Sequence, residues 1–294
     1  MLNYRFPIFQ YLSLVLVLLW PGLSVADDAI FTHAQSVSFN SAEFSYPISS
    51  FKLKLAKKQG KEPQARIEAE VAITGYLALP AGDGPHPAVV MLHTCAGLSE
   101  HDEAWSLRLQ SWGYVVLSVD SFTPRGFEYI CDGRLQGGAL TTPWIRALDA
   151  YGAKRFLASQ PFVDPERIAV IGMSHGAMTV LEVVKQSLTD GLQMQPFQAA
   201  VAFYPLCGQP APINTSVRVL VGDLDTWTPA YLCETLVSQL ESRFDISVTV
   251  FADTHHAFDH PGIDMIDAGH RIRTNPEATA IANTIVRALL EQKL

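Results

Sequence analysis

Short apolar runs recur along the chain from residue 88 onward, and they predict the strands of one sheet. Most of these runs are continuous rather than alternating, which is typical of parallel strands covered on both faces. They occupy residues 88–92, 115–119, 168–171, 199–204, 217–222 and 248–251. Upstream, residues 65–79 alternate in part, so we expect them to add antiparallel strands at the edge of the sheet.

Helical patterns fill the intervals between the apolar runs. They cover residues 104–111, 142–158, 177–185 and 230–242, and residues 276–292 close the chain. This alternation of strand and helix predicts an α/β fold with a mostly parallel, doubly wound sheet and helices on both faces. The sequence shows no internal repeat and no insertion long enough for a separate lid, so we expect a single domain over residues 27–294.

The composition agrees with one globular domain and narrows the range of partners. The chain has 294 residues, of which 48% are hydrophobic and 17% charged, enough for a large core. A net charge of −8, without a basic patch interleaved with aromatics, argues against a nucleic-acid partner. We expect the local lysine cluster to be a solvated loop or edge; it comprises Lys52, Lys54, Lys57, Lys58 and Lys61.

Residues 1–26 have the pattern of a secretory signal. Arg5 is the lone charge, residues 11–20 form the apolar segment, and Ser24-Val25-Ala26 supply small residues for cleavage. The apolar segment is short for a membrane-spanning helix and is interrupted by Pro21-Gly22. We therefore expect a periplasmic or secreted protein without stable membrane insertion after cleavage, and an uncleaved anchor is the alternative.

Export would allow the four cysteines to form disulfides. Cys95, Cys131, Cys207 and Cys233 can pair in three ways, and sequence alone does not choose among them. Cys207 closes one predicted strand and Cys233 lies in the helix after the neighbouring strand, so we hypothesise a Cys207–Cys233 bond. We hypothesise Cys95–Cys131 as the second bond.

The sequence Gly172-Met173-Ser174-His175-Gly176 carries the clearest chemical signal. It lies between an apolar strand, residues 167–171, and a helical stretch, residues 177–185. This is the Gly-x-Ser-x-Gly pattern of a nucleophile elbow, a sharp turn that exposes a serine hydroxyl. A serine hydroxyl is a weak nucleophile unless a base lies beside it. The five residues alone would also suit an ordinary strand-to-helix turn, so the partners decide.

Candidate partners follow the serine in the order that α/β-hydrolases use, acid before histidine. The strand at residues 217–222 ends in Asp223 and Asp225, and the next strand is followed by His255 and His256. The carboxyl ends of parallel strands meet at one edge of a sheet, so these side chains can converge on Ser174. The residues alone do not decide which of the two acids and which of the two histidines act with Ser174.

At this point the chain resembles the dienelactone hydrolase family of α/β-hydrolases. The resemblance extends from about Gly75 onward and rests on the elbow and on residues 87–93, 120–126, 222–229 and 256–258. The family places its acid in a Gly-x-x-Asp turn and its base in a His-Gly/Ala-Phe turn, which implies Asp225 and His256. Asp223 and His255 are then solvated or hydrogen-bonding neighbours.

The nucleophile departs from the family pattern. The best-known dienelactone hydrolases use cysteine, whereas this chain has Ser174, which looks more like the esterase and lipase branches of the superfamily. A serine nucleophile needs an oxyanion hole made of backbone N–H groups. We expect these amides from His175, the residue after the nucleophile, and by analogy from Cys95 in the loop after the strand at residues 88–92.

Other side chains near the strand ends are candidates for substrate contact. Arg125 could hold a substrate carboxylate through a bidentate pair, or could instead form a structural ion pair with Asp120 or Glu128. Aromatic residues could line an acyl pocket, although side chains of this kind are more often core. They are Trp144, Trp227, Tyr204 and Phe258.

A metal site is the weaker interpretation of the histidines. His255, His256 and His260 are irregularly spaced, and the chain has no Cys-x-x-Cys pair, so we expect neither a metal nor another cofactor. The sequence thus predicts an exported serine hydrolase that cleaves small-molecule esters or lactones through Ser174, His256 and Asp225. A peptidase or thioesterase on the same residues, or a binding protein on a retired hydrolase scaffold, are the alternatives. The oligomeric state is left open.

Overall fold

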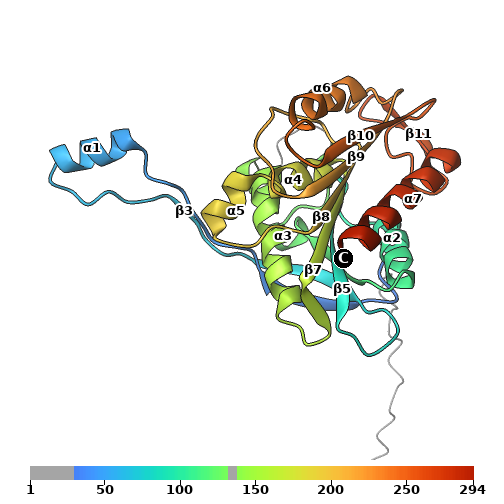
Figure 1. Cartoon of the computed structure of the whole chain (residues 1–294), viewed down its shortest axis with the longest axis horizontal. Coiled ribbons are helices and arrows are strands. Elements are labelled where there is room, and N and C mark those ends of the chain that lie inside the picture. Colours follow the sequence, from blue (N-terminus) through green and yellow to red (C-terminus); the bar gives the residue numbers. More distant parts are fainter. Residues whose placement is uncertain (1–29, 132–137) are drawn as a thin grey trace, which may run out of the picture.

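One central sheet of eight strands organises the molecule, in the order β1-β4-β6-β5-β7-β8-β9-β10 (Figure 1). The computed structural model describes residues 30–131 and 138–294, so the predicted signal at residues 1–26 lies outside the described residues. The strands from β6 to β10 run parallel, as predicted, and only β4 pairs antiparallel, with β1 and β6. The strands are β1 Gln35–Asn40, β4 Ala72–Ala78, β5 His86–Leu92, β6 Val115–Asp120, β7 Val163–Met173, β8 Ala199–Phe203, β9 Ser216–Gly222 and β10 Ile246–Phe251.

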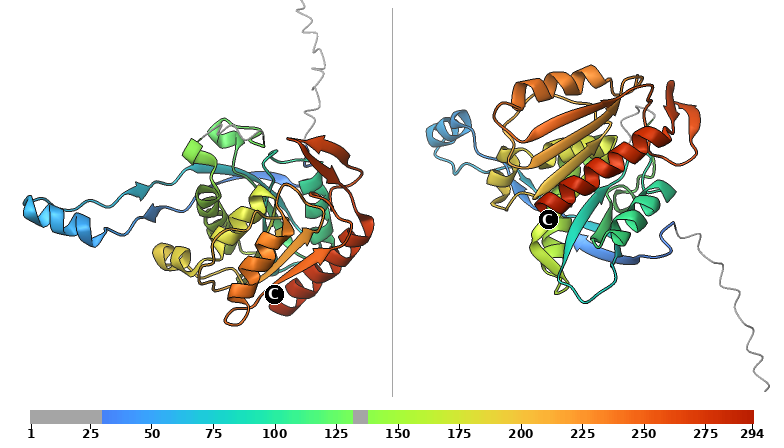
Figure 2. Two further views of the ribbon diagram at one scale, coloured as in Figure 1. Left: turned by 90° about the horizontal axis from the view of Figure 1, so that it is seen from above. Right: turned by 45° about the vertical axis from the view of Figure 1, so that its right-hand side comes forward.

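Helices cover both faces of this sheet, which explains why inner strands such as β5 are continuously apolar. In β5, Val90 and Leu92 face one core while Val89 and Met91 face the other, and all four are fully buried. The first face carries α3 Pro143–Ala158, α4 His175–Val183, α5 Gln186–Leu192 and α6 Ala230–Leu240; the second carries α2 Glu100–Ser111 and α7 Pro276–Lys293 (Figure 2). The predicted α/β-hydrolase architecture is therefore confirmed.

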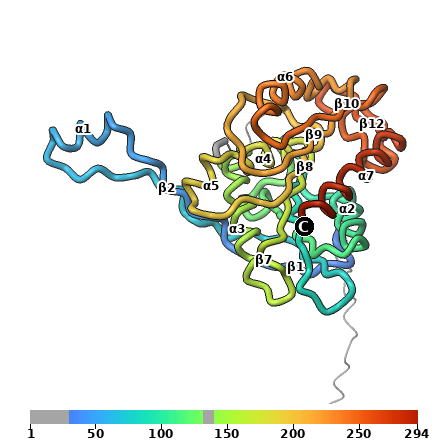
Figure 3. The backbone as a smooth tube through the Cα atoms, viewed as in Figure 1, coloured from blue at the N-terminus to red at the C-terminus, as the bar shows by residue number. Residues whose placement is uncertain are grey.

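The segment between β1 and β4 was only partly anticipated. Within residues 65–79 only β4 joins the central sheet, while β3 Ile67–Glu68 pairs with β2 Phe44–Ser45. Four of the five clustered lysines lie on a helix, α1 Ser50–Lys58, and not in the expected loop or edge, although all five are exposed to solvent as expected. We call residues 44–68 the arm, because they extend away from the sheet as a long hairpin with α1 at its tip (Figures 1 and 3).

Both hypothesised disulfides are present. Cys95–Cys131 joins the loop after β5 to the segment after the 3₁₀ turn Thr123–Arg125, and Cys207–Cys233 joins the loop after β8 to α6. In the described part of the chain no cysteine is free. No helix within residues 30–131 or 138–294 is both long and apolar enough to cross a membrane.

Candidate active site

Ser174 lies in a strained turn between β7 and α4. Its φ of 52° and ψ of −112° are outside the regions that a side chain favours, and neighbouring atoms hold it there. A Cβ on Gly172 would lie 2.3 Å from the Gly176 oxygen, and a Cβ on Gly176 would lie 2.0 Å from the Leu92 oxygen. The two glycines are therefore required so that strand and helix can approach closely around the serine.

The structure brings Ser174, His256 and Asp225 into one hydrogen-bonded chain. Ser174 Oγ lies 3.0 Å from His256 Nε2, and His256 Nδ1 lies 2.7 Å from Asp225 Oδ2. The three residues follow β7, β10 and β9, whose carboxyl ends meet at one edge of the sheet. All three are buried, with Ser174 retaining 9% exposure. A carboxylate behind the imidazole and a hydroxyl in front of it form the arrangement that serine activation requires.

Asp225 is fixed as an ionised acceptor. Its Oδ1 accepts from the Trp227 and Thr228 amides, both at 2.9 Å, and its Oδ2 accepts from Thr228 Oγ1 at 2.7 Å. Burial by itself raises the pKa of Asp225, but the hydrogen bonds and charge of His256, together with the Thr228 bonds, bring the pKa below its ordinary value. The carboxylate can therefore orient the imidazole and stabilise its protonated form.

The neighbouring acid and histidine are occupied by the backbone. Asp223 Oδ1 accepts from the Thr254 amide at 3.1 Å, and His255 Nδ1 lies 3.2 Å from the Leu224 carbonyl oxygen. These contacts pin the loops after β9 and β10 to each other. In the structure Asp225 and His256 are hydrogen-bonded toward Ser174, whereas Asp223 and His255 contact the backbone instead.

The two residues expected to supply oxyanion donors lie on segments next to Ser174. His175 is the first residue of α4, so its N–H has no partner within the helix. Cys95 lies in the loop after β5 and lines the same cavity as Ser174 and His256. These are the two segments from which oxyanion donors were expected.

Arg146 connects these two segments, and sequence reasoning missed it. Its Nη2 donates to the His93 carbonyl at 2.8 Å, and its Nη1 lies 2.7 Å from His175 Nδ1. Burial lowers the pKa of Arg146 to about 9, against the opposing effect of Asp149, so the guanidinium is charged at neutral pH. Burial and the Arg146 charge lower the pKa of His175 to about 3, so the imidazole is neutral and accepts. The sequence did contain an indication that Arg146 is buried, because residue 146 falls in phase with residues 150, 153 and 157 on the buried face of α3.

The cavity beside Ser174 has a volume of about 200 Å³. Trp227 lies beside the base, with its ring centroid 5.2 Å from that of His256, and Tyr204 packs edge-on at 4.6 Å. Met265 and Ile272 close another side. They belong to a hairpin of β11 Asp264–Asp267 and β12 His270–Arg273, which the sequence did not predict.

Arg125 and Trp144 do not line this cavity. Arg125 forms a bidentate ion pair with Asp149, at 2.7 and 2.8 Å. The predicted structural ion pair is therefore present, but the prediction of Asp120 or Glu128 as its partner is wrong. Asp149 approaches from α3, and no local pattern links it to residue 125. Trp144 Nε1 donates to the Tyr46 hydroxyl at 2.8 Å, at the base of the arm. Phe258 is fully buried in the core.

His260 lies near a second buried histidine–aspartate pair. His101 Nε2 is 3.0 Å from Asp259 Oδ2, and the His101 ring stacks on His260 at 4.9 Å. Trp105 and Tyr204 also donate to Asp259, so this carboxylate is fully occupied. Within the described ranges no group of three or more His, Cys, Asp or Glu could hold a metal ion.

The sheet, the elbow and the residues gathered at its edge define an α/β-hydrolase fold. The model of the dienelactone hydrolase family matches residues 73–294, and the chain belongs to this family. Members of this family are carboxylic ester hydrolases, and the chain is an enzyme of that class.

Individual relatives are distant. A Synechocystis sp. protein whose name suggests a carboxymethylenebutenolidase is 25% identical over 239 residues, covering 76% of this chain and 92% of that protein. The dienelactone hydrolase-like promiscuous phosphotriesterase P91, from metagenomic libraries, has a TM-score of 0.63 at 20% identity, covering 88% of this chain and 98% of that one. Dienelactone hydrolase from Anabaena variabilis has a TM-score of 0.55 at 15% identity, covering 89% and 99%. At these identities the two structures show a shared fold.

Proposed function

We propose that the chain is an exported serine esterase that works through Ser174, His256 and Asp225. The observation that carries the proposal is the continuous hydrogen-bonded chain from the Ser174 hydroxyl to the Asp225 carboxylate, with a cavity beside it. The signal-like sequence at residues 1–26 and the two disulfides support export to an oxidising compartment.

The geometry supports an acyl-enzyme mechanism. Ser174 Oγ attacks the ester carbonyl carbon as His256 Nε2 takes its proton, and Asp225 stabilises the resulting imidazolium. The His175 and Cys95 amides hold the carbonyl oxygen while it carries negative charge. The intermediate collapses, the alcohol leaves with the proton from His256, and a water activated by His256 then hydrolyses the acyl-enzyme.

Arg146 acts in this mechanism as a positioning residue. It contacts the His93 carbonyl and the His175 ring, so it keeps the Cys95 loop and the start of α4 at a fixed separation. Oxyanion donors contribute only if they are placed before the charge develops. The guanidinium is buried and contacts no solvent, so its contacts with the two segments are not weakened by water.

The cavity favours small, uncharged acyl groups. Its lining around Ser174 is mainly apolar or aromatic, from Tyr204, Trp227, Met265 and Ile272, and its volume is about 200 Å³. Arg125, the candidate for holding a substrate carboxylate, is occupied by Asp149. We therefore infer neutral short-chain esters as the preferred class, with neutral lactones next, although the name of the Synechocystis relative points to a carboxylate-bearing lactone.

A substrate panel tests this proposal. We expect the kcat/KM for p-nitrophenyl acetate and butyrate to exceed that for p-nitrophenyl octanoate, a thioester and an aminoacyl amide by at least about tenfold. The longer octanoyl chain should fit the cavity poorly, and the other two substrates should react more slowly with the serine. Ser174→Ala should lower kcat for the best substrate by at least about 10³-fold without changing the melting temperature by more than a few degrees. Wild-type turnover in Ser174→Ala would overturn the assignment of the nucleophile.

A further inference from the structure

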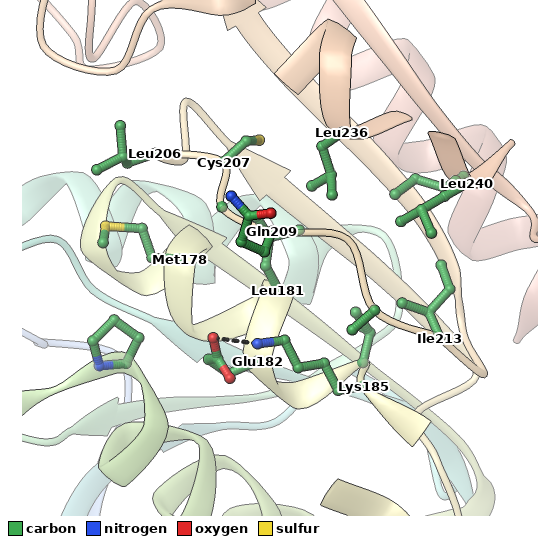
Figure 4. A pocket seen from close by; sticks show the side chains of 15 residues that line it. Met178, Leu181, Glu182, Lys185, Leu206, Cys207, Gln209, Ile213, Leu236 and Leu240 are labelled. Carbon is green, nitrogen blue, oxygen red and sulfur yellow. Dashed lines mark hydrogen bonds and ion pairs between the residues drawn. The ribbon is translucent and has the colours of Figure 1, made fainter. Parts of the chain in front are cut away.

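A second cavity, of about 310 Å³, lies outside the candidate active site (Figure 4). It is formed by α4, α6 and the loop that follows β8, and among the described residues it shares no lining side chain with the catalytic cavity. Its surface is mainly apolar, from Met178, Leu181, Leu206, Leu236 and Leu240, with the Glu182–Lys185 ion pair on one side. The proposed esterase mechanism makes no use of this cavity.

Whereas the second cavity is an unfilled apolar hollow, the arm presents uncovered apolar side chains to solvent. No residue of α1 is buried, and Phe51 is 73% exposed, with Leu53 and Leu55 also exposed. A nine-residue helix is too short to be stable by itself in water, even with the N-cap bond from Ser49. The helix therefore needs a surface against which it can pack.

The charges of the arm and of the body are complementary. Five lysines and no acid lie between residues 50 and 61, so the rest of the chain carries a formal charge of −13 against −8 for the whole. Exposed acids lie on the neighbouring helices or at their ends, with Asp190 on α5, Glu234 on α6 and Glu241 as the C-cap of α6. Opposite charges around an apolar contact favour docking of one surface on the other.

The arm root and the cavity lie at the two ends of one short helix, α5. Phe44 at the arm root packs near Gly191, the penultimate residue of α5, while Lys185, its N-cap, lines the cavity. The arm itself points away from the body, so α1 does not reach its own cavity (Figure 2). Two copies related by a twofold axis could therefore exchange arms, each filling the cavity of the other.

We propose that the protein forms a homodimer by reciprocal arm exchange, in which Phe51 and Leu55 of each copy enter the cavity between α4 and α6 of the other. Phe51 and Leu55 lie four residues apart and so share one side of α1. The lysines of α1 then approach a partner surface whose net charge is negative. A lysine-rich helix could also bind an anionic membrane, but a membrane would leave the apolar cavity unfilled, whereas arm exchange covers both exposed surfaces.

Sedimentation velocity on the mature chain tests the dimer. We expect a dimer in the wild type at micromolar concentration and at least a tenfold weaker dimer in Phe51→Ser, with a further weakening at high salt. Ile281→Ser is the matched control, because Ile281 is an exposed apolar residue on a different helix, α7, and should leave the dimer intact. Esterase activity should be retained in Phe51→Ser, so loss of the dimer can be separated from failure of the proposed catalysis. A wild type that is monomeric throughout would overturn the proposal.

Photocrosslinking identifies the contact itself. p-Benzoylphenylalanine at position 51 should give a covalent dimer on illumination, with the adduct in residues 206–213 or in α6. Mixing ¹⁴N- and ¹⁵N-labelled protein should produce mixed-isotope crosslinks, because the contact joins two copies. Crosslinks confined to one chain would overturn arm exchange, as would a monomer that co-sediments with phosphatidylglycerol vesicles but not with phosphatidylcholine vesicles.

Discussion

The Asp225→Asn substitution probes the proposed triad most selectively, because it changes one oxygen to an NH₂ group and keeps the shape. The Trp227 and Thr228 amides both donate to Oδ1, so the asparagine carbonyl must stay there and its NH₂ must face His256 Nδ1, 2.7 Å away. Nδ1 then has to accept, and the imidazole proton moves to Nε2. An Nε2–H donates toward Ser174 and cannot take the serine proton.

The size of the expected loss follows from this forced tautomer. We expect kcat to fall by about 10⁴-fold, as in other triads that lose the correct tautomer, which corresponds to about 5.4 kcal/mol of transition-state stabilisation. KM for p-nitrophenyl acetate should change little, since Asp225 does not line the cavity among the described residues. The free energy of unfolding should fall by only about 1–2 kcal/mol, the typical effect of weakened hydrogen bonds at one buried group.

The assay compares two identical chemical changes two residues apart. Steady-state hydrolysis of p-nitrophenyl acetate would be measured for Asp225→Asn and for Asp223→Asn, with melting temperatures as a check on folding. Asp223 accepts from the Thr254 amide, so its substitution should leave kcat within about threefold of wild type. If Asp225→Asn keeps more than a tenth of wild-type kcat, or Asp223→Asn loses as much, the assignment of the acid is wrong.

Three further predictions concern the groups around the site. Arg146→Met should lower kcat by about 10²-fold with less effect on KM, because the oxyanion donors lose their brace, and partial rescue by added guanidinium would distinguish this role from a purely structural one. His175 has its pKa lowered to about 3, so between about pH 6.5 and pH 3 the unfolded chain binds a proton that the folded protein does not. The contribution of neutral His175 to the free energy of unfolding is therefore fully present above pH 6.5 and decreases as the pH is lowered. In urea titrations, the free energy of unfolding of His175→Gln should fall with decreasing pH less steeply than that of the wild type, by up to about 1.4 kcal/mol per pH unit. Replacing Cys95 and Cys131 by serine should cost activity as well as about 3–4 kcal/mol of stability, whereas removal of the second disulfide should cost stability alone in calorimetry.

Much of the fold could be predicted because its strands are buried on both faces. The strands from β5 to β9 are buried over most of their length and appear as apolar runs that require no long-range information, whereas the edge strand β10 has only Ile246 and Phe251 buried. The arm and the β11–β12 hairpin lack such runs, since they expose most of their side chains, and none of residues 264–267 is buried. The edge strand β1 was missed for the same reason, because only Phe39 in it is buried.

The site was predictable where its chemistry is local. The elbow is contained in five residues, whereas Asp223 and Asp225 differ only in the direction that a turn gives each side chain, which residue type does not encode. Contacts between distant segments were beyond pattern reasoning, as with Arg125, which pairs with Asp149 from another element. Arg146 was missed because a charged residue on a buried helical stripe gives no indication of its partners until the fold brings them together.

Fluorophosphonate labelling of the purified protein tests the central claim most directly. The probe reacts with a serine only if a base has activated it, and mass spectrometry locates the adduct. We predict stoichiometric labelling of Ser174 in the wild type and its loss in His256→Ala. Absence of labelling in a folded protein with both disulfides intact, or undiminished labelling of Ser174 without His256, would contradict the proposed triad.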